Sequence, residues 1–509
     1  MSFNKSVKSG IQSDAARSKR EKISVSIRKE KKQEHLHKRR KEALTELATT
    51  QTHTQLQKLP EFVQMILTED LSQQIEGTKG LRQLLSLEMA YPIDFVIKEN
   101  LLPRLVAFLH SPSHDLQFEA AWALTNVASG NSQQTEAVVN AGAVPALVKC
   151  IGTPGKLNVK EQCIWALGNI AGEGAFSRNY ILMNGAMGVA VSAIEQAIHE
   201  NNRSILKNVV WALANLCRAK PLPEAHLLAP ALPLLSRLLS FPDNGVVSDA
   251  MWAFVYLTDS DDTQDLGRII DLGIVPRIME LAAQDAPNVQ TPCLRTLGNL
   301  LTGNDRQSDF VLSLGFLLTV KNIILTAQPA LQREAIWALS NVTAGNARQI
   351  SQVFELGLMV PVLKLLANAS FEVRKEALWC TANALVSGNP EHAAKIVQEG
   401  ALMAITQLLA VNDTDTILVA LDALSGLLRH GQSVANETGE ANCYVEALQQ
   451  SGGFEKICDL QKHPDEKVYN KSFGLLTKYF SEVGEEEEGA PEVVGQSYQF
   501  QYQNQGSFM

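Results

Sequence analysis

A five-residue pattern recurs along this chain of 509 residues and decides its fold. It reads Trp122-Ala-Leu-Thr-Asn126, Trp165-Ala-Leu-Gly-Asn169, Trp211-Ala-Leu-Ala-Asn215, Trp252-Ala-Phe-Val-Tyr256, Trp337-Ala-Leu-Ser-Asn341 and Trp379-Cys-Thr-Ala-Asn383, and these frames hold all six Trp. Two further frames keep the register without Trp, namely Arg295-Thr-Leu-Gly-Asn299 and Asp422-Ala-Leu-Ser-Gly426. Successive frames lie 41 to 46 residues apart, so the chain is a repeat array with a period of about 42 residues.

A second marker keeps the same period and defines the helices. A Gly followed by an apolar run recurs at Gly142, Gly185, Gly273, Gly315, Gly357 and Gly400, and Pro145, Pro276 and Pro361 follow three or four residues later. Gly ends one helix and Pro opens the next. Helical repeats of about 40–47 residues are typical of HEAT and armadillo proteins. Two short helices before a long Trp-bearing helix give three helices per repeat, which favours an armadillo repeat over a HEAT repeat.

We therefore predict an all-α fold, a right-handed superhelical armadillo solenoid of about ten repeats with a long concave groove. Residues 60–100 and 440–481 are expected to be degenerate capping units. The predicted organisation is a flexible basic arm and linker at 1–55, the solenoid at 56–481, and an acidic, Gln-rich disordered tail at 482–509.

The net charge of −9 hides a strong asymmetry. Residues 1–41 carry 14 Lys and Arg against 4 Asp and Glu, or +10, while 482–509 carry six Glu and no Lys or Arg, or −6. The remaining body carries −13. A basic arm predicts nucleic acid, a membrane surface or an acidic protein as partner, and here one acidic candidate is the body of the same chain.

Several classes of protein are disfavoured. No apolar run is long enough to span a membrane, and residues 1–22 lack the apolar region of a secretory signal. Seven scattered Cys without a C-x-x-C argue against disulfides or a zinc site. The chain has no H-E-x-x-H, G-x-x-x-x-G-K-[ST] or G-x-S-x-G motif, so we expect no enzyme activity, cofactor or metal.

Trp and Asn four residues apart share one helix face. Any single Trp is most simply a core residue, but a recurring buried Asn has no obvious packing reason. We therefore expect both residues on the surface, with the Asn amides clamping an extended peptide. Stacked indoles would form slots for cationic side chains, with cation–π attraction of about 0.5–2 kcal/mol each.

The array is interrupted in its middle, where Tyr256 replaces Asn and Arg295 replaces Trp. A cation at 295 is expected to repel Lys, which leaves two separate basic-peptide sites. Acidic side chains near these two sites would bind the charged ends of Lys and Arg side chains of the peptide, although each acidic residue alone is typical of a solvated surface charge. They are Glu173, Asp249, Asp305, Glu334 and Glu376.

The basic arm has several possible roles. It could be a solubilising tail, the protein's own localisation signal, or a non-specific nucleic-acid binder. However, Lys38-Arg39-Arg40 is also the kind of triplet that the groove would accept, and tethering would make it compete with ligand at an effective concentration of order mM. Direct nucleic-acid binding is not the expected function.

Over nearly its whole length the sequence resembles the importin-α family of nuclear import adaptors. The resemblance lies in the arm, Ile23-Ser-Val-Ser-Ile-Arg-Lys-Glu-Lys-Lys32 and Lys38-Arg-Arg40, in the Trp-x-x-x-Asn series, and in the loop Asn126-Val-Ala-Ser-Gly-Asn-Ser-Gln-Gln-Thr135. Two departures are Glu173, where the family usually has Asp, and Lys41 after the basic triplet. The tail from Gly489 to Met509 matches no family feature.

The resemblance implies residue roles. A major site for nuclear localisation signals would comprise Trp122, Asn126, Gly130, Thr135, Trp165, Asn169, Glu173, Trp211, Asn215 and Asp249. A minor site would comprise Asn299, Asp305, Glu334, Trp337, Asn341, Glu376, Trp379 and Asn383. Importin-β binding and autoinhibition would use Arg28, Lys31, Lys32, Lys38, Arg39 and Arg40.

The resemblance also implies cargo proteins and importin-β as partners, recycling by an export factor with Ran, and shuttling between cytoplasm and nucleus. The alternative is an armadillo scaffold in adhesion or signalling whose arm is its own localisation signal. Such a scaffold should have a basic groove, and the −13 body argues against one.

Overall fold

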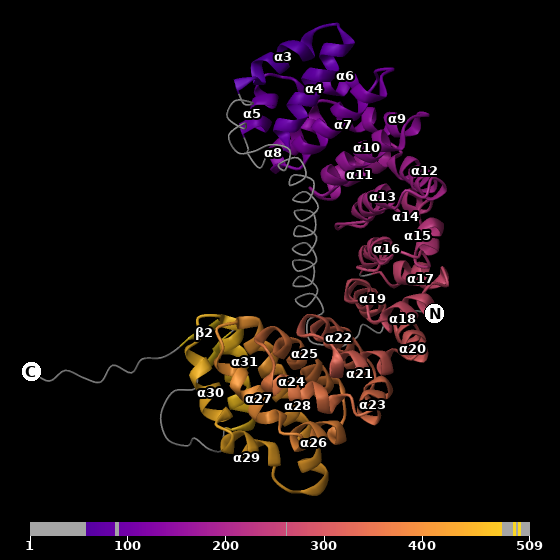
Figure 1. Ribbon diagram of the computed structural model, residues 1–509. Helices are drawn as coiled ribbons and strands as arrows, with labels where there is room; N and C mark the ends of the chain where they lie inside the picture. Colours follow the sequence, from indigo (N-terminus) through magenta and orange to yellow (C-terminus); the bar gives the residue numbers. More distant parts are fainter. Residues whose placement is uncertain (1–56, 87–90, 261, 481–491, 495–496, 500–509) are drawn as a thin grey trace, which may run out of the picture. The chain divides into compact units, whose positions relative to one another are not determined.

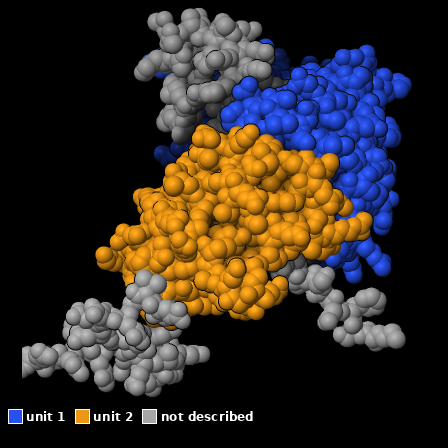
Figure 2. Space-filling view, turned by 90° about the horizontal axis from the view of Figure 1, so that it is seen from below, with its two compact units in different colours: residues 1–7, 12–338 blue, residues 8–11, 339–509 orange. Residues whose placement is uncertain are grey.

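The computed structural model describes residues 57–86, 91–260, 262–480, 492–494 and 497–499 (Figure 1). They fall into two compact units, of which unit 1 ends at residue 338 and unit 2 begins at residue 339 (Figure 2). The boundary lies within one helix, α22 (Pro329–Thr343). The predicted arm at 1–55, with its six candidate cations, lies outside the described residues.

Unit 1 begins with a two-helix repeat, α3 (Leu59–Leu67) and α4 (Leu71–Leu85). Three-helix repeats follow: α5 (Tyr91–Lys98), α6 (Leu102–Phe108), α7 (His114–Ala128); α8 (Ser132–Asn140), α9 (Ala143–Gly152), α10 (Leu157–Ala171); α11 (Ala175–Met183), α12 (Ala186–His199), α13 (Arg203–Leu216); α14 (Ala225–Leu228), α15 (Leu232–Leu238), α16 (Asn244–Leu257); α17 (Thr263–Asp271), α18 (Val275–Ala282), α19 (Pro287–Leu300); and α20 (Asp305–Ser313), α21 (Phe316–Thr326) with α22. The capping unit predicted at 60–100 is shorter in the structure, because α5 already belongs to the next repeat.

Unit 2 continues the pattern with α23 (Ala347–Glu355), α24 (Met359–Asn368), α25 (Phe371–Ser387); α26 (Pro390–Gln398), α27 (Ala401–Gln407) with a 3₁₀ turn at Leu408–Ala410, α28 (Thr414–Thr438); and α29 (Cys443–Gln450), α30 (Gly453–Asp459) with a 3₁₀ turn at Leu460–Lys462, α31 (Glu466–Tyr479). A short antiparallel pair follows, β1 (Glu492–Val494) with β2 (Ser497–Gln499), in which Val493 lies opposite Tyr498. This strand pair was not expected from the sequence.

The glycine markers end the first helix of their repeats. Gly142 and Gly185, for example, have φ of +79° and +82°, a left-handed conformation that glycine adopts without steric cost. Pro145 and Pro276 lie in the first turns of α9 and α18 as expected. The described residues thus contain one two-helix and nine three-helix repeats, which confirms the armadillo prediction of about ten.

The third helices form the continuous core of each unit. In unit 1, α4 packs on α7, α7 on α10, α10 on α13, α13 on α16 and α16 on α19; in unit 2, α25 packs on α28 and α28 on α31. Small residues permit this close approach: a Cβ added to Gly168 would lie 2.9 Å from the Ala212 Cβ on the next third helix. Every Trp frame lies on a third helix, so stacking of repeats brings equivalent frame positions together.

The seven cysteines carry no disulfide. The described ranges contain no cluster of His, Cys, Asp or Glu suited to a metal ion. In these ranges no single helix has the length and apolar character to cross a membrane, although three sharply bent helix pairs meet those two criteria together.

Candidate peptide-binding site

The Asn side chains of the frames are buried, which corrects the expectation that they are exposed. Asn169 is 0% exposed, and its Nδ2 donates to the carbonyl of Thr125 on the preceding third helix at 3.1 Å. Asn383 does the same to Ser340 at 2.9 Å within unit 2. Packing therefore does explain a recurring Asn, because each amide satisfies a carbonyl of the neighbouring repeat.

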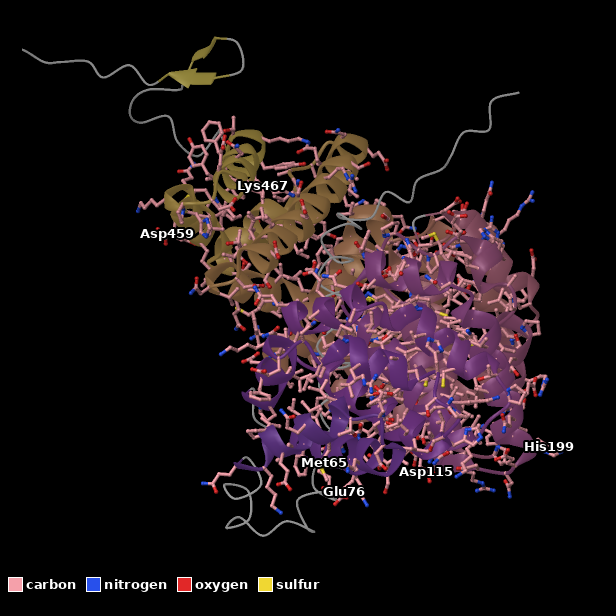
Figure 3. The ribbon with its side chains drawn as sticks, turned by 90° about the horizontal axis from the view of Figure 1, so that it is seen from above. Met65, Glu76, Asp115, His199, Asp459 and Lys467 are labelled. Atoms are coloured by element: carbon pink, nitrogen blue, oxygen red, sulfur yellow. The ribbon has the colours of Figure 1, made fainter. Side chains whose placement is uncertain are left out.

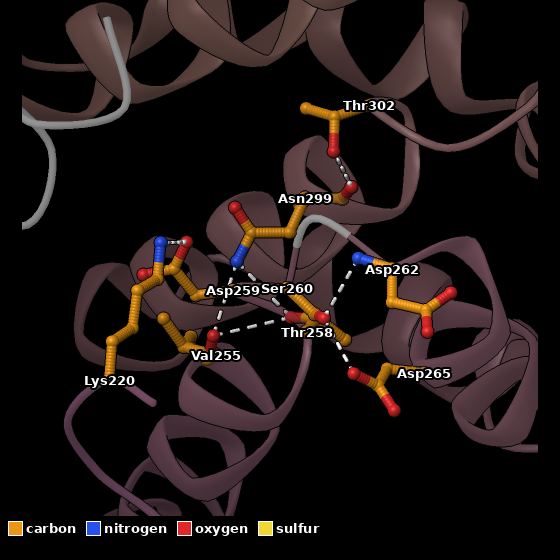
Figure 4. Close-up of polar contacts among 9 residues, drawn as sticks. All are labelled: Lys220, Val255, Thr258, Asp259, Ser260, Asp262, Asp265, Asn299 and Thr302. Carbon is orange, nitrogen blue, oxygen red and sulfur yellow. Dashed lines mark hydrogen bonds and ion pairs between the residues drawn. The ribbon is translucent and has the colours of Figure 1, made fainter. Parts of the chain in front are cut away.

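In unit 1, the amides of Asn126, Asn215 and Asn299 also donate to the preceding repeat. Asn126 donates to Ser86 Oγ at 3.0 Å, and Asn215 donates to the Gly168 carbonyl at 3.4 Å. Asn299 donates to the Val255 carbonyl at 3.1 Å and to Thr258 Oγ1 at 3.2 Å (Figure 4). Asn341 is likewise buried.

Two of these amides use only one of their two polar atoms in the scaffold. The Oδ1 atoms of Asn169 and Asn383 are buried and accept no hydrogen bond from any residue that the structure describes. A buried acceptor without a donor costs about 1–3 kcal/mol. An extended peptide offers backbone N–H donors at regular intervals, so these oxygens suit a peptide ligand.

The indoles are more enclosed than expected. Trp165 and Trp211 are 4% and 7% exposed, and their rings contact each other with centroids 5.8 Å apart and planes tilted by 53°. This pair is therefore in direct contact and leaves no open slot of the expected kind. Trp252 and Trp337 are also buried, whereas Trp122 and Trp379 are partly exposed.

The structure brings together two residues of the predicted major site, Thr135 and Glu173. Thr135 Oγ1 lies 3.4 Å from Glu173 Oε1, and Glu173 is exposed. Gly130 immediately precedes the cap of α8, in which Asn131 and Gln134 exchange side-chain and backbone hydrogen bonds. The carboxylate, hydroxyl and neighbouring loop form a compact acceptor site between two adjacent repeats.

The acidic candidates differ in environment. Asp249 and Glu376 are buried on α16 and α25, while Asp305 opens α20. Glu334 is not available as expected, because its Oε2 accepts from Arg295 Nε and its Oε1 from Arg295 Nη2, both at 2.8 Å. Burial by itself would raise the pKa of Glu334, but the charge and hydrogen bonds of Arg295, with help from Arg333, hold that pKa below its usual value.

Arg295 was expected to present a free cation at the interruption. The structure instead buries it against Glu334, and its guanidinium carbon lies 5.3 Å from the centroid of the Trp252 ring. The pair is neutral as a whole, so simple repulsion of Lys does not account for the interruption. The guanidinium instead lies against the buried indole of Trp252, on the preceding third helix.

Ion pairs at the ends of the third helices can be exposed. Asp115 in the first turn of α7 lies 3.3 Å from Lys156 at the start of α10, with side chains 74% and 56% exposed (Figure 3). Such pairs contribute about 0–1 kcal/mol. The buried pair of Arg295 and Glu334 belongs to a different class.

Comparison with known proteins places the chain in a family. Family models match as follows: importin beta binding domain at residues 4–79, armadillo/β-catenin-like repeat at 90–129, 131–172 and 267–302, and atypical Arm repeat at 442–492. The chain is 40% identical to importin subunit alpha-B of Dictyostelium discoideum (98% of this chain, 97% of that one). It is 39% identical to importin subunit alpha-2 of Arabidopsis thaliana (97% and 94%).

The chain belongs to the importin-α family. Importin subunit alpha-1b of Oryza sativa subsp. japonica is a further relative, at 38% identity (88% of this chain, 84% of that one). The crystal structure of an engineered protein superposes with a TM-score of 0.70 at 25% identity (82% of this chain, 98% of that one), which supports the fold.

As an importin-α, the chain is a nuclear import adaptor without enzymatic activity, and the signalling-scaffold alternative is not favoured. The importin-beta-binding match runs past the predicted arm boundary at 55 and includes α3 and most of α4.

Sequence reasoning missed one recurring feature of this importin-α. Asn131, Asn304, Asn346 and Asn389 each cap the first helix of a repeat in a reciprocal box with the residue three positions on, which is Gln134, Gln307, Gln349 and His392. The recurring sequence Gly-Asn-x-x-Gln, at 130–134, 303–307 and 345–349, could have predicted three of these helix caps.

Proposed function

We propose that this importin-α binds Lys/Arg-rich nuclear localisation signals as extended peptides along its third helices. The observation that carries the proposal is the site at Thr135 and Glu173, where an exposed carboxylate lies 3.4 Å from a buried hydroxyl. A Lys ammonium has three donors and no acceptor, so a site built of acceptors matches it.

The first run comprises Trp122, Trp165 and Trp211 with their Asn partners, Gly130, Thr135, Glu173 and Asp249. Its central support is Asn169, whose Oδ1 is left for a peptide N–H while Nδ2 holds the scaffold. Direct contact between Trp165 and Trp211 makes an apolar floor. The aliphatic stem of a Lys or Arg packs on such a surface while its charged head reaches a carboxylate.

The predicted minor-site residues are considered separately in each unit. Unit 1 holds Asn299, Asp305, Glu334 and Trp337, and unit 2 holds Asn341, Glu376, Trp379 and Asn383. Asn383 repeats the half-used amide of Asn169, and Trp379 is partly exposed beside it in sequence. Glu334 contributes through Arg295 rather than as a ligand for a cargo cation.

The basic arm is the proposed link to importin-β and the proposed autoinhibitor. The importin-beta-binding family match at 4–79 supports the first role. The charge of +10 in residues 1–41 and the acidic body support the second. We further propose that the chain shuttles between cytoplasm and nucleus, with recycling by an export factor and Ran.

A pull-down with a Lys-rich signal peptide tests the function. The full chain should be captured weakly alone and more strongly when importin-β is added, because importin-β removes the competing arm. A charge-matched peptide of Asp and Glu is the control and should not be retained. Failure to capture the chain with or without importin-β would exclude the proposal.

A further inference from the structure

Arg82 on α4 forms a buried contact with the first indole of the array. Its Nε donates to Glu119 Oε2 at 2.8 Å and its Nη2 approaches Glu119 Oε1 at 3.4 Å. Its guanidinium carbon lies 4.2 Å from the centroid of the Trp122 ring. Phe118 also contacts this indole edge to face, with ring centroids 5.5 Å apart.

The last indole of unit 1 before the interruption has a comparable partner. Arg295 lies over Trp252 and is held by Glu334. Glu119 and Glu334 occupy the same register, three residues before Trp122 and Trp337. Between these two ends, Trp165 and Trp211 contact each other.

We propose that the Arg82 guanidinium occupies the π face of Trp122, the first indole, where a cargo cation could otherwise bind. Arg82 thereby sets how many cargo cations the first run accepts. This inference rests on the proposed peptide-binding function. A ligand cation and the Arg82 guanidinium would compete for one π face and one carboxylate. The energetic scale is that of a cation–π contact plus a charged hydrogen bond.

The arrangement favours this role over that of a purely structural ion pair between repeats, called a clasp below. A clasp needs only the ion pair of Arg82 with Glu119, whereas the Arg82 guanidinium also stacks on the partly exposed Trp122 indole. Removal of Arg82 would leave the Glu119 carboxylate 8% exposed and without its cation. That position would then recruit a cation from a bound peptide.

Peptide length provides the test. The full chain is titrated with labelled peptides of four, five and six consecutive Lys or Arg residues flanked by Ala, and affinities come from fluorescence anisotropy at one salt concentration. The quantity compared is the ratio of affinities for the longest and shortest peptides. The arm is present in every variant, so its competition largely cancels in this ratio.

In Arg82→Gln the ratio should rise by roughly 2- to 30-fold over the unmodified chain. Arg82→Gln combined with Glu119→Gln should abolish the rise, because the acceptor is gone, while Arg82→Lys should keep the original ratio. The matched control is Arg104→Gln: Arg104 lies 5.1 Å from the Phe108 ring and pairs with Glu69 at 3.1 Å, but outside the Trp frames. It should leave the ratio unchanged.

An unchanged ratio in Arg82→Gln would overturn the inference and make Arg82 a clasp only. If Arg82→Gln fails to fold in a thermal scan, Arg82→Met keeps apolar contact with the indole, lacks the charge, and carries the same expectation. Absence of binding by the unmodified chain to all three peptides would instead refute the proposed function, so the two failures are distinguishable.

Discussion

Asn169 Nδ2 donates a hydrogen bond to the carbonyl oxygen of Thr125, which precedes it by 44 residues and lies on the neighbouring third helix. The distance is 3.1 Å, and both residues are buried. The same amide leaves its Oδ1 without a described partner. One side chain thus joins two repeats and keeps a buried acceptor that the proposed function uses for a peptide N–H, so a substitution here should change both stability and binding.

Asn169→Ala should therefore affect both stability and binding. Loss of the buried bond should reduce the free energy of unfolding by about 1–3 kcal/mol. The affinity for a single-cluster signal peptide should fall more than in Asn341→Ala, because the family resemblance places Asn169 in the major site and Asn341 in the minor site. Calorimetric titration and thermal unfolding of both variants measure the two effects. Equal affinity losses would show that the runs are not graded.

Deletion of residues 1–41 should tighten signal-peptide binding. The arm carries +10 in this segment, and a tethered competitor acts at an effective concentration of order mM. The gain should be largest at low salt and shrink as screening increases. Anisotropy titrations at two ionic strengths measure it. A deletion variant with unchanged affinity at low salt would remove autoinhibition from the proposal.

Arg295→Met should be destabilising because it removes the main cation of buried Glu334 and leaves only the longer contact with Arg333 Nη2 at 3.4 Å. Breaking such a pair costs about 3–5 kcal/mol. The double variant Arg295→Met with Glu334→Leu should recover much of this loss, since apolar replacements remove both charges. Chemical denaturation of the single and double variants gives the comparison, and a double variant no more stable than the single one would contradict it.

The same pair predicts a pH dependence. The pKa of Glu334 is lowered in the folded protein, so its contribution is complete above the usual Glu pKa of about 4.3 and is lost as pH falls through the lowered folded value. In Arg295→Met, burial is opposed only by Arg333, so the pKa of Glu334 should rise above its value in the unmodified chain. The stability gap between the two proteins should narrow on acidification, and unfolding midpoints from pH 7 to 4 would show it. A constant gap would argue against the ion pair as the cause.

Gly130→Ala should weaken the cap of α8. An added Cβ would lie 2.0 Å from Gln134 Oε1, which is engaged in the capping box. Displacing Gln134 should cost about 1 kcal/mol and disturb the loop beside Thr135. Gly188→Ala is the matched control: on α12 its Cβ meets nothing within 4 Å, so it should be neutral or stabilising. Thermal scans and peptide titrations of both variants test this. Equal unfolding midpoints and equal peptide affinities in the two variants would contradict the prediction.

Local patterns in the sequence were sufficient to predict the helices and their period. Gly142 and Pro145 mark a helix junction by backbone preference alone, and the Trp frames reveal the period through their spacing. The contacts of Arg82 with Glu119 and of Arg295 with Glu334 were not predictable in this way. Each joins residues 37 or 39 positions apart on different repeats, and charge alone does not say which partner a buried guanidinium will meet.

The sequence by itself determined that this chain is an array of armadillo repeats with every Trp on a third helix, because a 42-residue period and helix-ending glycines are local signals. Only the tertiary structure decided which face of those helices is buried. Asn126, Asn169 and Asn383 lie inside rather than on the surface because stacking brings a carbonyl of the preceding repeat within reach of each amide. That partner exists only once the repeats are packed.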